Sequence, residues 1–255
     1  MKTAKESNTS REVVTIPGSV SHIFVSDAII ALSGWRAKAY TQSMKDKGSK
    51  AGIPGAELQQ IIDLSRLLSE FGVIKRLTRL TNGENESDAH HCFTLALTAL
   101  EIAKRYAPEL STEKVMLYAL VHDLTELVTG DMSTLNATAD QLKEKARRDE
   151  AALEDTLRLF ADYPHIAAAV EAYELKADEE SVFVYWLDKM ITIPTHFFDD
   201  GANLRANGVA TREAIAHWYE KLQEKLARLD RRPHAAASEI LEQTYKKMHD
   251  ELFTE

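Results

Sequence analysis

The sequence predicts an all-α protein, a bundle of helices preceded by a less regular N-terminal arm. Leu, Ile, Val and Ala recur at three- and four-residue steps almost without interruption from about residue 56 onward. With 44% hydrophobic residues and only 10 Gly and 6 Pro, the 255-residue chain can bury a sizeable core and has few helix breakers. Strand signals after residue 55 are essentially absent, so we expect helices throughout this part.

The N-terminal part of the chain is the least regular. The stretch VVTIPGSVSHIFV resembles a short strand or an extended arm, and QSMKDKGSKAGIPG is typical of a polar linker. These patterns predict three parts: an extension of unknown role over residues 1–55, a main helical domain over 56–205, and C-terminal helices over 206–255 that pack on that domain or on a partner subunit.

The helices expected after the arm end at ordinary capping signals. Ser111 and Thr112 can cap one helix, and Gly130 follows its last residue. Pro164 and Pro233 stand near the starts of two others, where proline is tolerated. The apolar pattern places the helices over 56–73, 87–106, 112–129, 138–161, 164–176, 179–199, 210–230 and 234–252.

Charge and cysteine content exclude several classes of protein. A net charge of −9 argues against a surface built for nucleic-acid backbones or anionic membranes, although a local basic pocket for one small phosphate is compatible with it. The single cysteine, Cys92, rules out an intrachain disulfide. The sequence contains neither an apolar run long enough to cross a membrane nor the apolar centre of a signal peptide, so we expect a cytoplasmic protein.

The stretch from Tyr118 to Asp131, YALVHDLTELVTGD, combines an apolar helical pattern with ionisable side chains. His122 and Glu126 are four residues apart and share a helix face, and Asp123 lies beside them. Burying such groups costs several kcal/mol each unless they are paired or bound to a metal. The alternative is a helix C-terminus whose acidic residues face solvent.

Two further segments supply similar residues. His91 opens the strongly apolar helix ESDAHHCFTLALTALEIA, where a core or capping histidine is the alternative. Asp188 interrupts the apolar run SVFVYWLDKMITI, and an exposed position is the alternative because Lys189 follows it. Together, His91, His122, Asp123 and Asp188 would form a nitrogen and oxygen site suited to one divalent ion such as Mn, Co, Fe or Zn.

This ordered set resembles the HD-domain metal-dependent phosphohydrolases, whose signature is a histidine, a later His-Asp dipeptide and a distant aspartate. It is most similar to the 5′-deoxynucleotidase-like branch, in which a glutamate three residues after the aspartate and then a Gly-Asp continue the motif, as in HDLTELVTGD here. Glu86 and His91 match the branch's E-x-x-x-x-H pattern, while His90 leaves a ligand assignment shifted by one residue open. The resemblance covers roughly residues 60–200 and implies an HD-domain helical bundle.

The resemblance also implies substrate-binding residues. An arginine fifteen residues before the first histidine holds the substrate phosphate in that family, and Arg76 stands at this spacing. The family places a tryptophan next, which helps to exclude ribose, whereas this sequence has Leu77, so selectivity for the deoxy sugar stays open. Asp131 is implied to accept a hydrogen bond from a sugar hydroxyl. The alternatives are a solvated basic face for Arg76 and Arg79, and an ordinary turn for Asp131.

The implied activity is removal of the 5′-phosphate from (deoxy)nucleoside monophosphates by a metal-activated water. Asp123 and Glu126 are the implied catalytic residues, and Glu126 would orient the water or pass a proton to the departing alkoxide. Members that use two metals usually add two histidines between the His-Asp pair and the last aspartate, and only His165 lies there, which favours one metal. The alternatives are a triphosphohydrolase, another HD phosphodiesterase, or a helical scaffold with a structural metal.

The partners expected from this reading are few. A small nucleotide is the substrate, and neither nucleic acid nor a membrane is expected to bind. The amphipathic segments AIAHWYEKLQEKLARL and SEILEQTYKKMHDELF suit either intramolecular packing or a homodimer, and the family resemblance favours the dimer.

Overall fold

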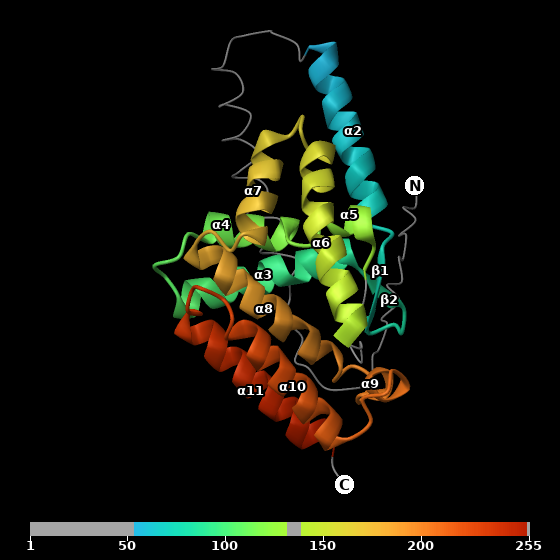
Figure 1. Ribbon diagram of the computed structural model, residues 1–255, viewed down its shortest axis with the longest axis vertical. Coiled ribbons are helices and arrows are strands. Elements are labelled where there is room, and N and C mark those ends of the chain that lie inside the picture. Colours follow the sequence, from blue (N-terminus) through green and yellow to red (C-terminus); the bar gives the residue numbers. More distant parts are fainter. Residues whose placement is uncertain (1–53, 132–138, 254–255) are drawn as a thin grey trace, which may run out of the picture. The chain divides into compact units, whose positions relative to one another are not determined.

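The structure, a computed structural model, describes residues 54–131 and 139–253. The predicted arm and nearly all of the predicted linker therefore lie outside the described residues. The predicted all-α class is confirmed, because helices make up nearly all of the regular structure (Figure 1). The helices are α2 (Gly55–Phe71), α3 (Asp88–Tyr106), α4 (Thr112–Val121), α5 (Glu126–Thr129), α6 (Ala139–Leu159), α7 (Pro164–Glu174), α8 (Glu179–Thr195), α9 (Ala202–Ala206), α10 (Arg212–Leu226) and α11 (Ala235–Leu252).

The expectation that strands are absent after residue 55 is wrong at one place. Strands β1 (Lys75–Arg79) and β2 (Asn85–Ser87) form an antiparallel hairpin, with Lys75 opposite Ser87 and Arg79 opposite Asn85. The turn contains Asn82 and Gly83, and Gly83 has a φ of 82°, a conformation that glycine adopts without steric cost. The Asn-Gly pair is the sequence signal for this hairpin.

The predicted helix over 112–129 is also wrong in part, because the chain turns between α4 and α5. His122 is the C-cap of α4, and its ring nitrogen Nδ1 lies 3.0 Å from the carbonyl oxygen of Ala119. In a continuous helix that carbonyl would accept the N–H of Asp123. The imidazole of His122 donates to this carbonyl oxygen instead, and helix α4 ends immediately before His122 and Asp123.

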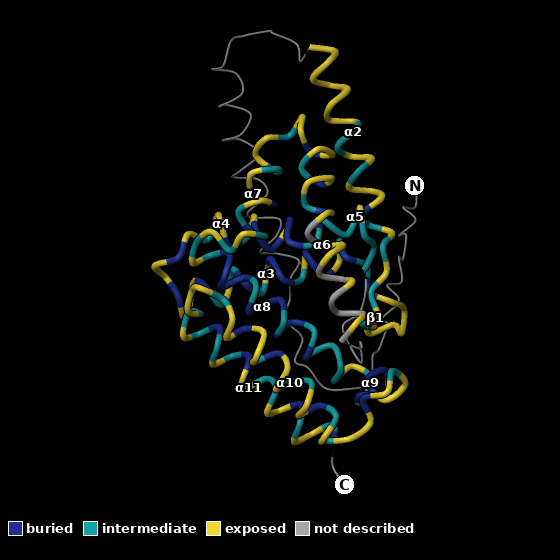
Figure 2. Tube along the Cα trace, viewed as in Figure 1, coloured by how far each residue is buried: buried dark blue, intermediate teal, exposed yellow. Residues whose placement is uncertain are grey.

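The core is formed mainly by α3, α4, α8 and α11. Alanines 96, 99 and 103 lie on the buried side of α3 and let α4 approach closely. Helix α8 is buried on most sides, because it packs against α3 and α4 as well as against α11 (Figure 2). Only Phe71 is buried on α2, and the first turns of that helix are exposed. The central position of α3, α4 and α8 sets the depth of the site described below.

Two further differences from the sequence expectation concern α8 and α9. Helix α8 ends at Thr195, earlier than predicted, and the short α9 was not predicted. The bounds of the predicted domains stay a prediction. Among the described residues, no helix combines the length and apolar character needed to cross a bilayer.

Candidate metal centre

His91 lies in the second turn of α3 and points into the core. Ser87 caps this helix by accepting a hydrogen bond from the backbone N–H of His90, which fixes the first turn. His91 is 1% exposed, and its Nε2 lies 2.9 Å from Oδ1 of Asp188. Its Nδ1 faces Oε2 of Glu86 at 3.6 Å, whereas the side chain of His90 is 48% exposed. Of the two adjacent histidines, His91 is therefore the one aimed into the bundle.

His122 presents a nitrogen to the same point from α4. Because Nδ1 faces the carbonyl of Ala119, the neutral ring carries its proton there and keeps a lone pair on Nε2. That Nε2 lies 2.9 Å from Oδ2 of Asp123 and 3.5 Å from Oδ1 of Asp188, but its geometry is not that of a hydrogen bond to either. A buried lone pair that faces carboxylate oxygens requires a proton or a cation between them.

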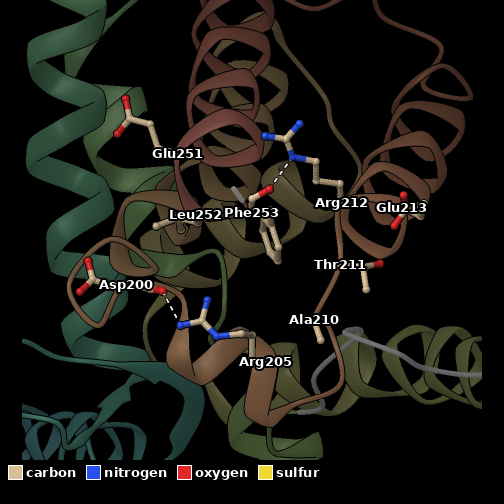
Figure 3. Close-up of a pocket in the computed structure, with 9 residues that line it drawn as sticks. All are labelled: Asp200, Arg205, Ala210, Thr211, Arg212, Glu213, Glu251, Leu252 and Phe253. Carbon is tan, nitrogen blue, oxygen red and sulfur yellow. Dashed lines mark hydrogen bonds between the residues drawn. The ribbon is translucent and has the colours of Figure 1, made fainter. Parts of the chain in front are cut away.

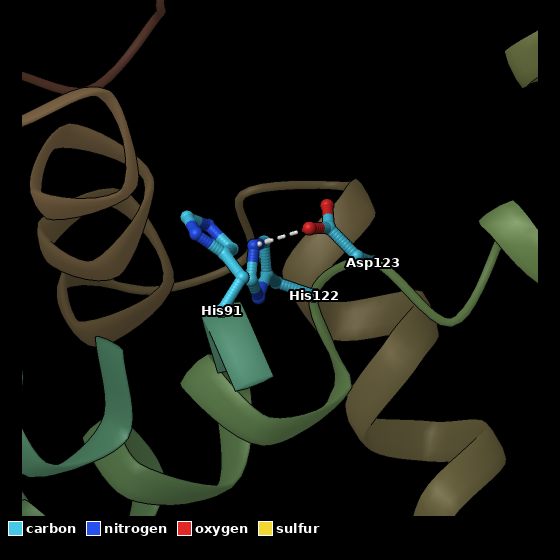
Figure 4. A group of neighbouring side chains, drawn as sticks. All are labelled: His91, His122 and Asp123. Carbon is cyan, nitrogen blue, oxygen red and sulfur yellow. Dashed lines mark ion pairs between the residues drawn. The ribbon is translucent and has the colours of Figure 1, made fainter. Parts of the chain in front are cut away.

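The four side chains predicted as ligands thus converge from three places in the chain. One ligand atom each from His91, His122 and Asp123 lies within 4.8 Å of the other two (Figure 4), and Asp188 Oδ1 is close to both imidazoles. First-row divalent ions bind such atoms at about 2.0–2.2 Å, which places neighbouring ligand atoms about 3 Å apart. The outer nitrogens of both imidazoles face oxygen acceptors, as metal-bound histidines require. The residues present therefore fit a divalent metal ion, whose identity and number stay open.

The electrostatic surroundings keep the two aspartates ionised. Burial alone would raise the pKa of Asp123, but His122 and Arg76 outweigh it and hold this pKa below its usual range. Burial likewise opposes ionisation of Asp188, and Lys189 outweighs it and keeps that pKa well below its usual range. Ionised carboxylates are the form that binds a cation.

Arg76 reaches the cluster from β1. Side chains alternate along a strand, and Arg76 lies on the inward side with 15% of its side chain exposed. Its Nη1 lies 2.6 Å from Oδ2 of Asp123 and 3.1 Å from Oδ1 of Asp88. The alternative of a solvated basic face therefore does not describe Arg76.

Glu126 and Asp131 lie on the same side as Arg76. Burial, followed by the charges of Asp123 and Asp88, raises the pKa of Glu126 to about 10. Oxygen atoms of Asp88, Asp123 and Glu126 lie within 4.8 Å of one another. The charge of Asp131 contributes to the raised pKa of Glu126, which places this carboxylate in the neighbourhood of the cluster.

The structure does not bring Leu77 into the cluster. Leu77 follows Arg76 on β1 and therefore points to the opposite face of the strand, where it is 41% exposed. Its carbonyl oxygen accepts a hydrogen bond from Nδ2 of Asn203 at 2.8 Å. A role of the Leu77 side chain in sugar selectivity stays a prediction.

Sequence reasoning missed two residues that contact this centre. Asp88 is fully buried and paired with Arg76, yet an acidic residue in the first turn of a helix is common and gives no sign of burial. Lys189 pairs with Oδ2 of Asp188, although its position next to Asp188 suggested an exposed pair from the sequence. Asp188 is only 4% exposed. The neighbouring lysine was therefore a signal for the ion-pair partner of this buried aspartate, not a sign of exposure.

Comparison with known proteins identifies the family of this chain. A family model for the HD domain matches residues 72–230. The 5′-deoxynucleotidase HDDC2 of Mus musculus is 31% identical over 135 residues, which cover 49% of this chain and 64% of that protein. The human HDDC2 is 29% identical over 150 residues, covering 55% of this chain and 69% of that protein. The 5′-deoxynucleotidase ECA3034 of Pectobacterium atrosepticum is 32% identical over 71 residues, covering 26% of this chain and 36% of that protein.

The fold has a counterpart among solved structures. A crystal structure from Magnetospirillum magnetotacticum, described as a predicted metal-dependent phosphohydrolase, aligns with a TM-score of 0.56 at 22% identity, covering 78% of this chain and 98% of that chain. The match to the mouse relative spans 64% of that protein, just under two thirds of its length. Since the family model spans more than half of the chain and contains every residue of the cluster, this protein belongs to the HD-domain family.

Proposed function

We propose that this protein is a metal-dependent nucleotide phosphohydrolase that removes the 5′-phosphate from (deoxy)nucleoside monophosphates. The observation that carries the proposal is the convergence of two buried imidazoles, the buried carboxylate of Asp188 and the largely buried carboxylate of Asp123, with nitrogen–oxygen distances of 2.9–3.5 Å, beside the largely buried Arg76. The 5′-deoxynucleotidase activity named for the mouse, human and bacterial relatives supports the choice of substrate class.

The metal would be held by His91, His122, Asp123 and Asp188. A divalent ion bound there supplies charge neutralisation for a phosphoryl group and lowers the pKa of a water molecule so that it can act as the nucleophile. The protein's own contribution is to fix the ligands. Glu86 and the carbonyl of Ala119 face the outer nitrogens of the two histidines, so both Nε2 atoms point inward.

The phosphate would be bound by Arg76. The guanidinium already lies 2.6 Å from the Asp123 oxygen nearest His122, so phosphate oxygens placed beside the ion would meet its remaining N–H groups. Asp88 accepts a second hydrogen bond from the same Nη1 and so limits the rotation of the guanidinium. Asp131 would accept a hydrogen bond from the sugar hydroxyl, and Leu77 would bear on selectivity between ribose and deoxyribose.

Glu126 would carry the proton that the leaving group needs. Without a metal ion, burial and the neighbouring carboxylates raise the pKa of Glu126 to about 10, so this carboxyl group holds a proton at neutral pH that it would donate to the 5′-oxygen as the P–O bond breaks. Proton transfer of this kind contributes about 10² to 10⁴ in rate. Asp123 would act together with Glu126. Its Oδ2 lies 2.9 Å from Nε2 of His122 and 2.6 Å from Nη1 of Arg76, so it joins the proposed metal site to the phosphate-binding arginine.

Triphosphate release from nucleoside triphosphates and cleavage of phosphodiesters are the alternative reactions of the same centre. The test is metal analysis of the purified protein, followed by assays with Mn, Co, Mg and Zn on nucleoside mono-, di- and triphosphates and cyclic nucleotides. We expect inorganic phosphate from deoxynucleoside monophosphates. Triphosphate as the product, or hydrolysis of diesters alone, would replace the proposed reaction by one of the alternatives.

A matched variant separates catalysis from a structural metal. Glu126→Ala should lose activity while metal content is unchanged, because Glu126 is not among the four proposed ligands. Asp188→Asn should lower metal content and activity together. If Glu126→Ala left hydrolysis intact with the metal bound, the catalytic assignment of Glu126 would fail, whereas a bound metal without hydrolysis in the unaltered protein would identify a scaffold.

A further inference from the structure

A second cavity, whose lining contains none of the proposed metal ligands, lies between the turn that joins α7 to α8 and the segment that follows α10. Its volume is about 510 Å³, and its charged lining residues are Lys176, Arg228, Arg231 and Asp230. Three cationic side chains therefore face one carboxylate, in a chain whose net charge is −9. Such a local reversal of charge is typical of a site for an anion.

Lys176 has a backbone conformation that is unfavourable for a lysine. Its φ of 49° lies in the left-handed region, which favours glycine at the end of a helix. Its ammonium group donates to the carbonyl oxygen of Tyr173 at 2.7 Å and lies over the rings of Tyr173 and Tyr185, at 3.9 and 4.7 Å from their centroids. None of the ion pairs formed by the described residues includes Lys176. A half-buried cation is thus retained there without a direct ion pair, although the charge of Glu174 acts on it.

Helix α10 and the segment after it add further cations. Lys225 lies 5.8 Å from the ring of Tyr185, and Arg228 follows it by three residues. Within the described part of the chain, neither Arg228 nor Arg231 forms an ion pair. These cations outnumber Asp230, the carboxylate in the same lining, so they repel one another in part, and a bound anion would relieve that repulsion.

Another cavity of the described residues lacks these properties. It has a volume of about 640 Å³ and lies between α9, the start of α10 and the end of α11 (Figure 3). Its two arginines, Arg205 and Arg212, face three carboxylates, and both donate to backbone carbonyls, those of Asp200 and Phe253. Its carboxylates therefore outnumber its cations.

We propose that the cavity lined by Lys176, Arg228 and Arg231 binds a polyphosphate chain, as carried by a nucleoside di- or triphosphate, at a site separate from the metal centre. Guanidinium groups form paired hydrogen bonds with phosphate oxygens, and a lysine adds a point charge. The volume is within the range of small-molecule sites and exceeds what one phosphate needs. Asp230 can accept a hydrogen bond from a sugar hydroxyl.

The site also borders the metal centre. The ring of Tyr173, over which Lys176 lies, packs edge-on against the ring of His122 at 5.8 Å. Lys189, which pairs with Asp188, lies 5.0 Å from the ring of Tyr185. A polyphosphate bound at Lys176 would therefore lie one side chain away from a metal ligand, a position suited to an effector.

The test is equilibrium dialysis of the full chain against radiolabelled inorganic pyrophosphate and, separately, a nucleoside triphosphate. The double variant Arg228→Gln/Arg231→Gln removes two cations from the cavity. Its matched control, Arg66→Gln/Arg105→Gln, removes the same charge from exposed positions on α2 and α3. Arg76→Ala removes the proposed phosphate contact at the metal centre and leaves the cavity intact.

Lys176→Gly separates binding from folding. Glycine adopts the positive φ of this position without strain, so the variant should keep or raise the melting temperature while it loses the ammonium group. If it bound pyrophosphate as the unaltered chain does, Lys176 would not belong to the site.

We expect pyrophosphate to bind the unaltered chain, the Arg66/Arg105 control and Arg76→Ala with similar affinity, and to bind the cavity variants about tenfold or more weakly. Tighter binding of the nucleoside triphosphate would identify a nucleotide as the ligand, and equal binding would identify the phosphate chain alone. Absence of binding, binding unaffected by the cavity variants, or binding abolished by Arg76→Ala would overturn the proposal. None of these outcomes depends on hydrolytic activity, so the proposed reaction is judged separately.

Discussion

Replacement of Glu126 by glutamine should stabilise the metal-free protein and abolish its catalysis when metal is restored. Folding raises the pKa of this carboxyl group from 4.5 to about 10, because burial and the charges of Asp123 and Asp88 disfavour its ionised form. A raised pKa favours folding while the group is protonated, below about 4.5, and this contribution is lost as the pH rises toward 10.

The magnitude follows from the span of pH over which the shift acts. At about 1.36 kcal/mol per pH unit, holding a proton on Glu126 in the folded state costs up to about 5 kcal/mol at pH 8, but only about 0.7 kcal/mol at pH 5. Burial also raises the pKa of Asp88, which lies beside Glu126, so the two carboxyl groups do not both ionise and the value at pH 8 is an upper bound. Glutamine is neutral at both pH values and avoids the cost.

Urea denaturation of the chelator-treated protein at pH 5 and pH 8 measures the effect. Glu126→Gln should raise the free energy of unfolding by a few kcal/mol at pH 8 and by less than about 1 kcal/mol at pH 5. Phosphate release by the metal-loaded variant should fall about 10²- to 10⁴-fold. The exposed Glu84→Gln serves as the control and should change neither quantity. Equal effects at the two pH values, or destabilisation at pH 8, would refute this account of Glu126.

Three further substitutions test the surroundings of the centre. His91→Ala should lower metal content and remove activity while His90→Ala retains both, because only His91 points inward; the reverse result in metal analysis would shift the ligand by one residue. Asp88→Asn should raise KM for the phosphate substrate about tenfold, because Arg76 loses a charged partner at 3.1 Å. Arg79→Gln, a substitution at an exposed position, is the control and should leave KM unchanged. If Asp88→Asn also left KM unchanged, Asp88 would have no positioning role. Phe93 and Leu97 lie one turn apart on α3 and are 58% and 47% exposed, which makes them candidates for a contact in the predicted homodimer. Phe93→Asp should then halve the mass of that dimer measured by light scattering. An unchanged mass would remove this face from consideration.

The ligand set could be predicted from the sequence because it depends on identity and order along the chain. His122 and Asp123 are adjacent, and Asp188 interrupts an apolar helix. The sequence alone therefore indicates that burying these side chains would be costly without a partner. What could not be predicted is the partner of each group. Asp88 looked like an ordinary first-turn acid, and Lys189 looked like a sign of exposure, until the fold placed them against Arg76 and Asp188.

The secondary-structure prediction failed where local sequence signals competed. The hairpin that carries Arg76 was missed because a five-residue and a three-residue strand give little periodicity, and its Asn-Gly turn was the only strong sign. The helix over 112–129 was extended too far because its apolar pattern continues through Leu124, and the side-chain bond of His122 to Ala119 that accompanies its end has no signature in periodicity.

The charge balance of the centre connects its stability to its metal. Two cationic side chains, Arg76 and Lys189, face a larger number of carboxyl groups, namely Glu86, Asp88, Asp123, Glu126 and Asp188. The protein can offset this excess by holding protons. Burial disfavours the charged imidazoles, yet nearby carboxylates still raise the pKa of His91 and of His122, and Glu126 keeps its proton.

A divalent cation would take over from the extra protons on His91 and His122, because a metal-bound imidazole is neutral. Metal binding at neutral pH should therefore release about one to two protons per ion, measured by calorimetry in buffers of different ionisation enthalpy. Asp188→Asn should weaken metal binding by removing a ligand. Glu126→Gln should leave affinity nearly unchanged, since the proton on Glu126 is needed for the leaving group and not for the ion. Metal binding without proton release would mean that the histidines are neutral beforehand, and the excess negative charge would then have to be offset by groups outside this cluster.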